Sequence, residues 1–237
     1  MNAHFRQGVR DAGYTLGGAW SIAAAVASLL VLTIASVLEG QVVTTADAAR
    51  EVQLRLLGGV VFGLVLPLFA FGVSARLGGS LRELMLTSWA RYGGHRRGYA
   101  LGRQALAAVL TGALAGVLAL LALGLGSATA APGLTLPLSL GNMLAVVWVG
   151  ALGSVTYVAA FAAAYAYAGN TGRAVFLVGD WLLGSGTSLL ALPWPRAHLG
   201  SLLGAESPIG LAPRDSAVCL VIIATVATVA YARRVPR

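Results

Sequence analysis

The sequence contains no lysine, and all 16 of its basic residues are arginines. A P-loop uses a lysine to neutralise the phosphates of a bound nucleotide, so this chain cannot hydrolyse ATP by that route. With a single cysteine, Cys219, it cannot form an intramolecular disulfide. Its three histidines, His4, His95 and His198, fall outside the long apolar stretches, and their spacing indicates no zinc site.

Charge is also scarce, because only 10% of the residues are charged while 58% are hydrophobic and the mean hydropathy is +0.82. A soluble domain carries about 25% charged residues. Here 27 consecutive residues between Asp11 and Glu39 carry no charge, and neither do 69 between Arg103 and Arg173. We therefore expect an integral membrane protein in which residues 1–237 form one domain, with no separate catalytic domain.

Six apolar stretches are long enough to cross a bilayer, which takes about 20 residues of helix. Turn residues separate them, among them Pro132-Gly133, Gly169-Asn170 and Pro193. The sequence thus predicts an all-α membrane protein with six transmembrane helices. The expected spans are 16–38, 56–75, 104–128, 140–168, 174–192 and 216–232.

The arginines are distributed unequally between the two sides of these spans. One side holds twelve, namely Arg6, Arg10, Arg76, Arg82, Arg91, Arg96, Arg97, Arg103, Arg173, Arg233, Arg234 and Arg237. The other side holds four, namely Arg50, Arg55, Arg196 and Arg214. Because cytoplasmic loops carry the excess of basic residues, we expect a multi-pass protein of the cell inner membrane with both termini in the cytoplasm. Basic loops that hold the protein in its membrane orientation then explain the net charge of +8. Membrane lipids are expected partners, and no nucleic-acid partner is expected.

The loop between the second and third spans predicts a short amphipathic helix. Ser80 and Glu83 have the spacing of a capping box, and Gly93 supplies a stop. One face of that helix collects Leu81, Leu84, Met85, Trp89 and Tyr92. From the residues alone, two interpretations remain open: a helix resting on lipid headgroups, or a docking helix for a soluble partner.

The run from Gly79 to Ser88, followed by a basic stretch and Tyr99-Ala100-Leu101-Gly102-Arg103, resembles the first cytoplasmic loop of ABC-2 type permeases, the membrane subunits of a class of ABC exporters. The resemblance implies that the loop is a coupling helix docking on a separate ATPase subunit, which holds the ATP and Mg. It also implies a second permease subunit, identical or a paralogue. The chain itself would be non-catalytic, without a cofactor or metal of its own. The implied docking residues are Ser80, Leu81, Arg82, Glu83, Leu84, Met85, Trp89, Arg91, Arg96 and Arg97.

Asp180 is the one acidic residue inside an expected span. A charge at the bilayer centre costs at least about 2.5–3.5 kcal/mol, so Asp180 is expected to face protein or water. It either makes a structural contact with a neighbouring span or lines the pathway. The second interpretation supports an alternative function, a secondary transporter or membrane scaffold without an ATPase, with Asp180 as its coupling acid. Tyr157 and Phe161, four residues apart, are further pathway candidates, with ordinary packing as the other interpretation.

The segment 193–213, between the last two spans, leaves three interpretations open. It is an interfacial aromatic anchor, a short re-entrant helix, or a ligand site in which His198 and Trp194 bind a group such as haem. A single histidine without a second ligand at a suitable spacing is weak evidence for a metal.

Overall fold

The structure is a computed structural model, and it describes residues 3–40, 45–77, 96–128 and 139–235. Every regular element in these ranges is helical, which confirms the all-α prediction. Four helices are long and apolar enough to cross a membrane: Arg50–Leu77, Arg96–Gly124, Leu140–Leu183 and Pro213–Arg234. A shorter apolar helical stretch occupies Ile22–Leu38. Length and composition thus indicate a membrane-embedded protein.

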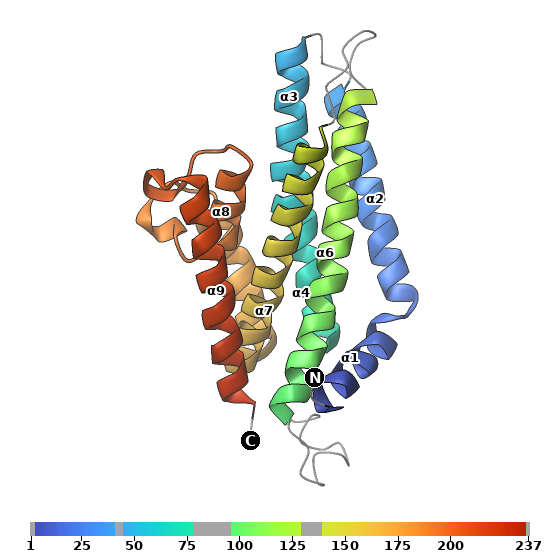
Figure 1. Cartoon of the computed structure of the whole chain (residues 1–237), viewed down its shortest axis with the longest axis vertical. Helices are drawn as coiled ribbons and strands as arrows, with labels where there is room; N and C mark the ends of the chain where they lie inside the picture. Colours follow the sequence, from blue (N-terminus) through green and yellow to red (C-terminus); the bar gives the residue numbers. More distant parts are fainter. Residues whose placement is uncertain (1–2, 41–44, 78–95, 129–138, 236–237) are drawn as a thin grey trace.

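The helices form an elongated bundle with a short helical cap near one end (Figure 1). In chain order they are α1 (Ala3–Leu16), α2 (Ala19–Gly40), α3 (Ala46–Arg55), the π-helix η1 (Leu56–Val65), α4 (Leu66–Leu77), α6 (Arg96–Ala128), α7 (Leu140–Leu183), the 3-10 turn η3 (Leu189–Ala191), α8 (Pro195–Leu202), the 3-10 turn η4 (Pro208–Gly210) and α9 (Pro213–Arg234). Since α3, η1 and α4 follow one another without a gap, they act as one rod.

Helix α7 folds back on itself. A straight helix of its 44 residues would be about 66 Å long, with Tyr157 and Asp180 about 35 Å apart. Instead, the Tyr157 hydroxyl lies 2.6 Å from the Asp180 carboxylate. The reversal occurs at Ala168 (φ −136°, ψ 17°) and Gly169 (φ 62°, ψ −146°). The helix is therefore a hairpin of two limbs, 140–167 and 170–183, and its tip lies where Gly169-Asn170 was predicted to end a span.

Replacing Gly169 with valine is expected to lower the thermal unfolding midpoint in detergent. At φ 62° and ψ −146° only glycine is unstrained, so a β-branched residue would cost about 1–3 kcal/mol. A matched control is Gly59→Ala, since a methyl there also meets no atom within 4 Å but needs no left-handed backbone. Equal losses of midpoint in the two variants would contradict the assignment of Gly169 as the hinge of the hairpin.

The N-terminal helix α1 was not predicted as a separate element. It is distinct from the first apolar stretch because the chain bends at Gly17 and Gly18. Its buried residues Gly8, Ala12 and Leu16 recur every four positions, which puts them on one face. That face crosses α6 very closely: a Cβ on Gly8 would collide with the Tyr99 carbonyl, as would one on Gly102 with the Phe5 carbonyl. The Tyr99 hydroxyl also donates to Asp11 over 2.9 Å.

The fifth apolar segment is shorter than expected. The predicted span was 174–192, but the helix ends at Leu183 and Gly184 is its C-cap. The pair Gly184 and Gly186 interrupts the helix before the prolines do, as glycine at a helix end commonly does. Pro195 then opens α8, where its missing N–H costs nothing. Residues after 183 therefore belong to the cap rather than to a long helix.

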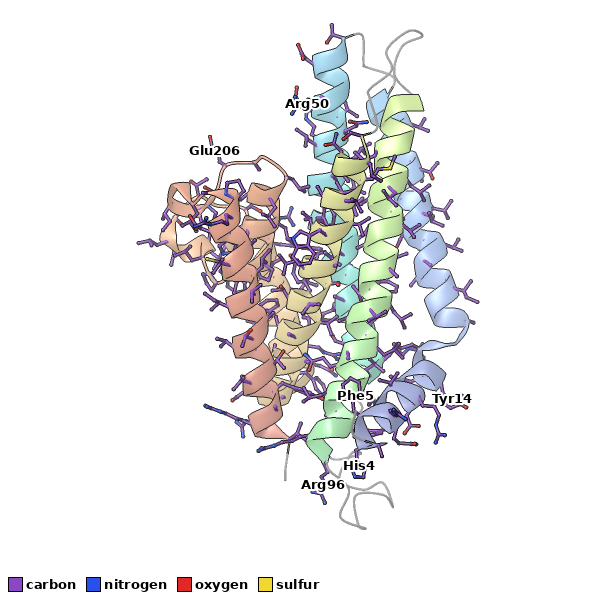
Figure 2. All side chains as sticks on the ribbon, in the orientation of Figure 1. His4, Phe5, Tyr14, Arg50, Arg96 and Glu206 are labelled. Atoms are coloured by element: carbon purple, nitrogen blue, oxygen red, sulfur yellow. The ribbon has the colours of Figure 1, made fainter. Side chains whose placement is uncertain are left out.

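The two ends of the chain lie at the same end of the bundle (Figure 1). His4, Tyr14 and Arg96 are found there, whereas Arg50 and Glu206 lie at the opposite end (Figure 2). This grouping is the one expected from the arginine distribution. We call the end with the termini the arginine-rich end and the other the cap end.

Candidate functional site

The Asp180 carboxylate is the centre of a buried polar network. Its side chain is fully buried, and both of its oxygens accept hydrogen bonds. The Tyr157 hydroxyl donates to Oδ2 over 2.6 Å, and the backbone N–H of Arg196 donates to Oδ1 over 3.1 Å. Tyr157 is on the first limb of α7, Asp180 on the second, and Arg196 near the start of α8. One carboxylate thus joins three helical segments.

Arg196 extends this network to the π-helix η1. Its Nη1 donates to the backbone carbonyl of Gly63 over 2.7 Å. A Cβ on Gly63 would lie 2.6 Å from the Gly58 carbonyl oxygen and 3.1 Å from Nη2 of Arg196, so this close approach needs glycine. π-Helical turns are rare and often occur at functional sites. The Arg196 guanidinium thus bonds the cap to the α3–η1–α4 rod, beside the apolar packing of Leu199, Leu202 and Leu203.

Arg196 also lines a cavity of about 560 Å³ at the cap end, between the rod, the end of α7 and α8, in which charged side chains are set in a mostly apolar lining. Arg55 and Glu51, which form an exposed ion pair of 2.6 Å, line its wall together with Glu206. Because much of the remaining lining is glycine, the backbone is accessible there. These glycines are Gly58, Gly59, Gly184, Gly186, Gly200 and Gly204.

A second cavity of about 380 Å³ adjoins the first, because Leu54, Leu203 and Gly204 line both. Its polar lining comes from Arg50, Gln53 and Asn142; Gln53 also donates to the Leu123 carbonyl over 3.0 Å. Side chains of both charge signs surround the two cavities. They can contact a polar or zwitterionic group by charge and hydrogen bonding.

Tyr157 and Phe161 lie in an aromatic cluster between the two limbs of α7. The Phe161 ring packs 5.6 Å from Phe71, 5.2 Å from Phe176 and 6.0 Å from Tyr157, between ring centroids. Both predicted pathway residues are fully buried. In this conformation the structure therefore brings Asp180, Tyr157 and Phe161 together as a packed unit, separate from the linings of the two cap-end cavities.

His198 is buried in α8, and its Nε2 lies 2.8 Å from the Leu192 carbonyl. A carbonyl only accepts, so Nε2 carries the proton. Burial lowers the pKa of the imidazole, against the smaller opposing effect of that hydrogen bond, and so favours the neutral ring. No group of three or more His, Cys, Asp or Glu side chains gathers to hold a metal in the part of the chain that the structure describes.

Most of the predicted docking helix falls outside the described residues, namely Ser80, Leu81, Arg82, Glu83, Leu84, Met85, Trp89 and Arg91. Arg96 and Arg97, the last two of that set, open α6 at the arginine-rich end. Nε of Arg97 donates to the Val235 carbonyl over 3.4 Å, which joins the start of α6 to the end of α9.

The sequence did not single out Arg196 or Gly63. Arg196 was counted only as one arginine of an outer loop, although its place directly after Pro195 is a signal for the first turn of a helix. Gly63 had no such signal, since it is one glycine in an apolar run. The carboxylate, guanidinium and cavity are thus features that only the folded chain reveals.

Compared with known proteins, the chain matches no protein-family model, no curated protein and no solved structure.

Proposed function

We propose that this chain is the permease subunit of an ATP-driven exporter of the ABC-2 type, in the cell inner membrane with both termini in the cytoplasm. One observation carries the proposal. Helix α4 ends and α6 begins at the arginine-rich end, where both termini also lie (Figure 1). The segment that joins them contains the capped amphipathic helix predicted from Ser80 and Glu83. A soluble subunit in the cytoplasm would meet that helix directly.

We propose that the chain crosses the membrane six times. The proposed passes are helix α2, the α3–η1–α4 rod, α6, the two limbs of α7 and α9 (Figure 1). Four helices that contain them are long and apolar enough to cross a membrane. An even number of passes agrees with termini on one side. The excess of arginine at that end supports its assignment to the cytoplasm.

The energy source would be a partner chain. Without lysine this sequence lacks a P-loop, so ATP and Mg would bind to a separate ATPase subunit. That subunit would contact Leu81, Leu84 and neighbouring residues of the coupling helix. A second permease subunit, identical or a paralogue, would complete the translocation path. ATP binding would then switch the spans between inward and outward access.

The alternative, proton coupling through Asp180 without an ATPase, receives less support. Both carboxylate oxygens are already engaged, and the side chain is fully buried. A coupling acid must exchange protons with water during the cycle, and here the nearest groups are the Tyr157 hydroxyl and the Arg196 backbone. The geometry favours an anchor between α7 and α8.

Affinity purification in mild detergent tests the proposal. We expect a stoichiometric second chain with a Gly-x-x-x-x-Gly-Lys-Ser/Thr motif, and ATP hydrolysis by the purified complex. Its repeated absence, together with transport that follows a proton gradient, would contradict the export proposal and favour the alternative.

A further inference from the structure

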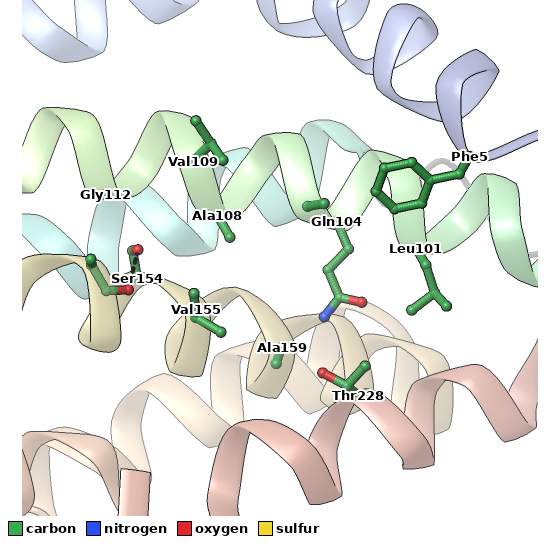
Figure 3. Close-up of a pocket in the computed structure, with 12 residues that line it drawn as sticks. Phe5, Leu101, Gln104, Ala108, Val109, Gly112, Ser154, Val155, Ala159 and Thr228 are labelled. Atoms are coloured by element: carbon green, nitrogen blue, oxygen red, sulfur yellow. Dashed lines mark hydrogen bonds between the residues drawn. The ribbon is translucent and has the colours of Figure 1, made fainter. Parts of the chain in front are cut away.

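A lateral cavity of about 540 Å³ opens between α1, α6, α7 and α9 (Figure 3). It exists because small residues face each other across α6 and α7, among them Ala108, Gly112, Ala151 and Ala159. The lining is almost entirely apolar. Val109 and Val155 at its edge are 65% and 46% exposed. Since α6, α7 and α9 are all candidate membrane helices, this cavity would face the hydrocarbon of a bilayer that they span.

Gln104 places an amide in the mostly apolar wall, pointing toward α7 and α9 (Figure 3). Ser154 and Thr228 contribute the hydroxyl groups of the lining. Oε1 of Gln104 is buried without a hydrogen-bond partner, which is costly away from water. A half turn of the amide would exchange its acceptor and donor. The group can therefore satisfy either a hydroxyl or an ester carbonyl of a ligand, and it marks the cavity as a site for an amphiphile.

Five arginines lie at the helix ends next to the arginine-rich end of this cavity, and none of them is part of its lining. Gln104 lies eight residues after Arg96, or about 12 Å along α6, and the α6 start meets the α9 end where Arg97 bonds Val235. The arginines of these two helix ends are Arg96, Arg97, Arg103, Arg233 and Arg234, and α6 contains no acidic residue. Asp11, on neighbouring α1, already accepts a hydrogen bond from Tyr99. An anionic headgroup at this depth would be attracted by about 1 kcal/mol per arginine.

We propose that the lateral cavity holds an acyl chain of an anionic phospholipid whose phosphate lies against the arginines of the α6 start and the α9 end. Along the membrane normal the protein presents arginine, then amide, then apolar wall. A phospholipid presents phosphate, then glycerol ester, then hydrocarbon, in the same order. The volume lies within the range of about 300–1,000 Å³ typical of ligand pockets. The inference needs only the membrane location and is independent of the export proposal.

Photo-crosslinking in bilayers tests it with the full-length chain. Phosphatidylglycerol and phosphatidylcholine, each with a diazirine on the acyl chain, are incorporated at equal fractions, and the labelled peptides are mapped by mass spectrometry. We expect phosphatidylglycerol to label residues around 104–112 more strongly than phosphatidylcholine. Ala108→Phe, which fills the cavity, should abolish this labelling. Val117→Phe, on the same helix at a 53% exposed position outside the cavity lining, should leave it unchanged.

Three outcomes would overturn the proposal. Labelling that persists in both Ala108→Phe and Val155→Phe would show that the cavity is not the site; the second variant guards against misfolding of the first. Equal labelling by the two lipids, unaltered by joint Arg233→Gln and Arg234→Gln substitution, would contradict the proposed preference for an anionic headgroup. A disulfide between two chains carrying Val109→Cys in a Cys219→Ser background would show that a second copy covers the cavity instead.

Discussion

Leu84→Asp is expected to abolish co-purification of the ATPase subunit while the chain still inserts into the membrane. Leu84 lies on the apolar face of the predicted docking helix, and burying such a side chain contributes about 1.5–3 kcal/mol. An unpaired carboxylate at that position adds a desolvation cost. A total loss of roughly 3 kcal/mol or more weakens the complex by about a hundredfold. Pull-down from solubilised membranes, quantified against the permease, measures the effect.

A second disruptive variant and a neutral control accompany this experiment. Glu83→Lys reverses the charge at the capping position and is also expected to release the ATPase. Ala90→Ser, on the polar face of the predicted helix, should keep wild-type recovery. Wild-type recovery with both Leu84→Asp and Glu83→Lys would remove the docking assignment. Labelling of Ser80→Cys, in a Cys219→Ser background, by a membrane-impermeant reagent added outside the cell would do so too.

Asp180→Ala is expected to destabilise the fold by roughly 2–6 kcal/mol, because it leaves two buried donors without an acceptor at about 1–3 kcal/mol each. These donors are the Tyr157 hydroxyl and the Arg196 backbone N–H. Tyr157→Phe removes one of the two bonds and should cost less, about 1.5–3 kcal/mol if the carboxylate is ionised. Thermal melting in detergent measures this, and we expect the unfolding midpoint to decrease from wild type to Tyr157→Phe and further to Asp180→Ala.

Asp180→Asn separates an anchor from a coupling acid. The asparagine oxygen can accept from Arg196 while its amide donates to the Tyr157 oxygen, so the fold should lose little stability. An anchor role therefore predicts transport close to wild type at normal expression. Loss of transport in a stably folded Asp180→Asn variant would instead indicate that the carboxyl itself is required, as the coupling-acid alternative demands.

The apolar stretches were sufficient to predict the helical class, because the bilayer requires every backbone group to be paired within a helix or closed barrel. The turn at Gly169-Asn170 was also predictable, since glycine is the residue that tolerates φ 62°. Helix ends were less certain: α6 begins at Arg96, before the expected 104, and α9 covers Pro213–Arg234 against the expected 216–232. Charged residues at the interface can extend a helix beyond its apolar core.

The partners of Asp180 could not be predicted from the sequence. Tyr157 was noted for its spacing to Phe161, but its contact with Asp180 depends on the register between the two limbs of α7. Arg196 meets Asp180 through its backbone, so its side-chain chemistry carried no signal. The contact with Gly63 likewise uses a main-chain carbonyl, which every residue possesses. Such contacts are fixed by three-dimensional register rather than by residue type.

The hairpin of α7 also has a consequence for how its two limbs enter the membrane during synthesis. Asp180 alone would disfavour entry of the second limb into the hydrocarbon, by at least about 2.5–3.5 kcal/mol near its centre. Its partner Tyr157 emerges from the ribosome 23 residues earlier. The limb that is synthesised first thus supplies the hydrogen-bond donor for the limb that follows. Biogenesis of this region is accordingly expected to proceed by insertion of the two limbs as a pair.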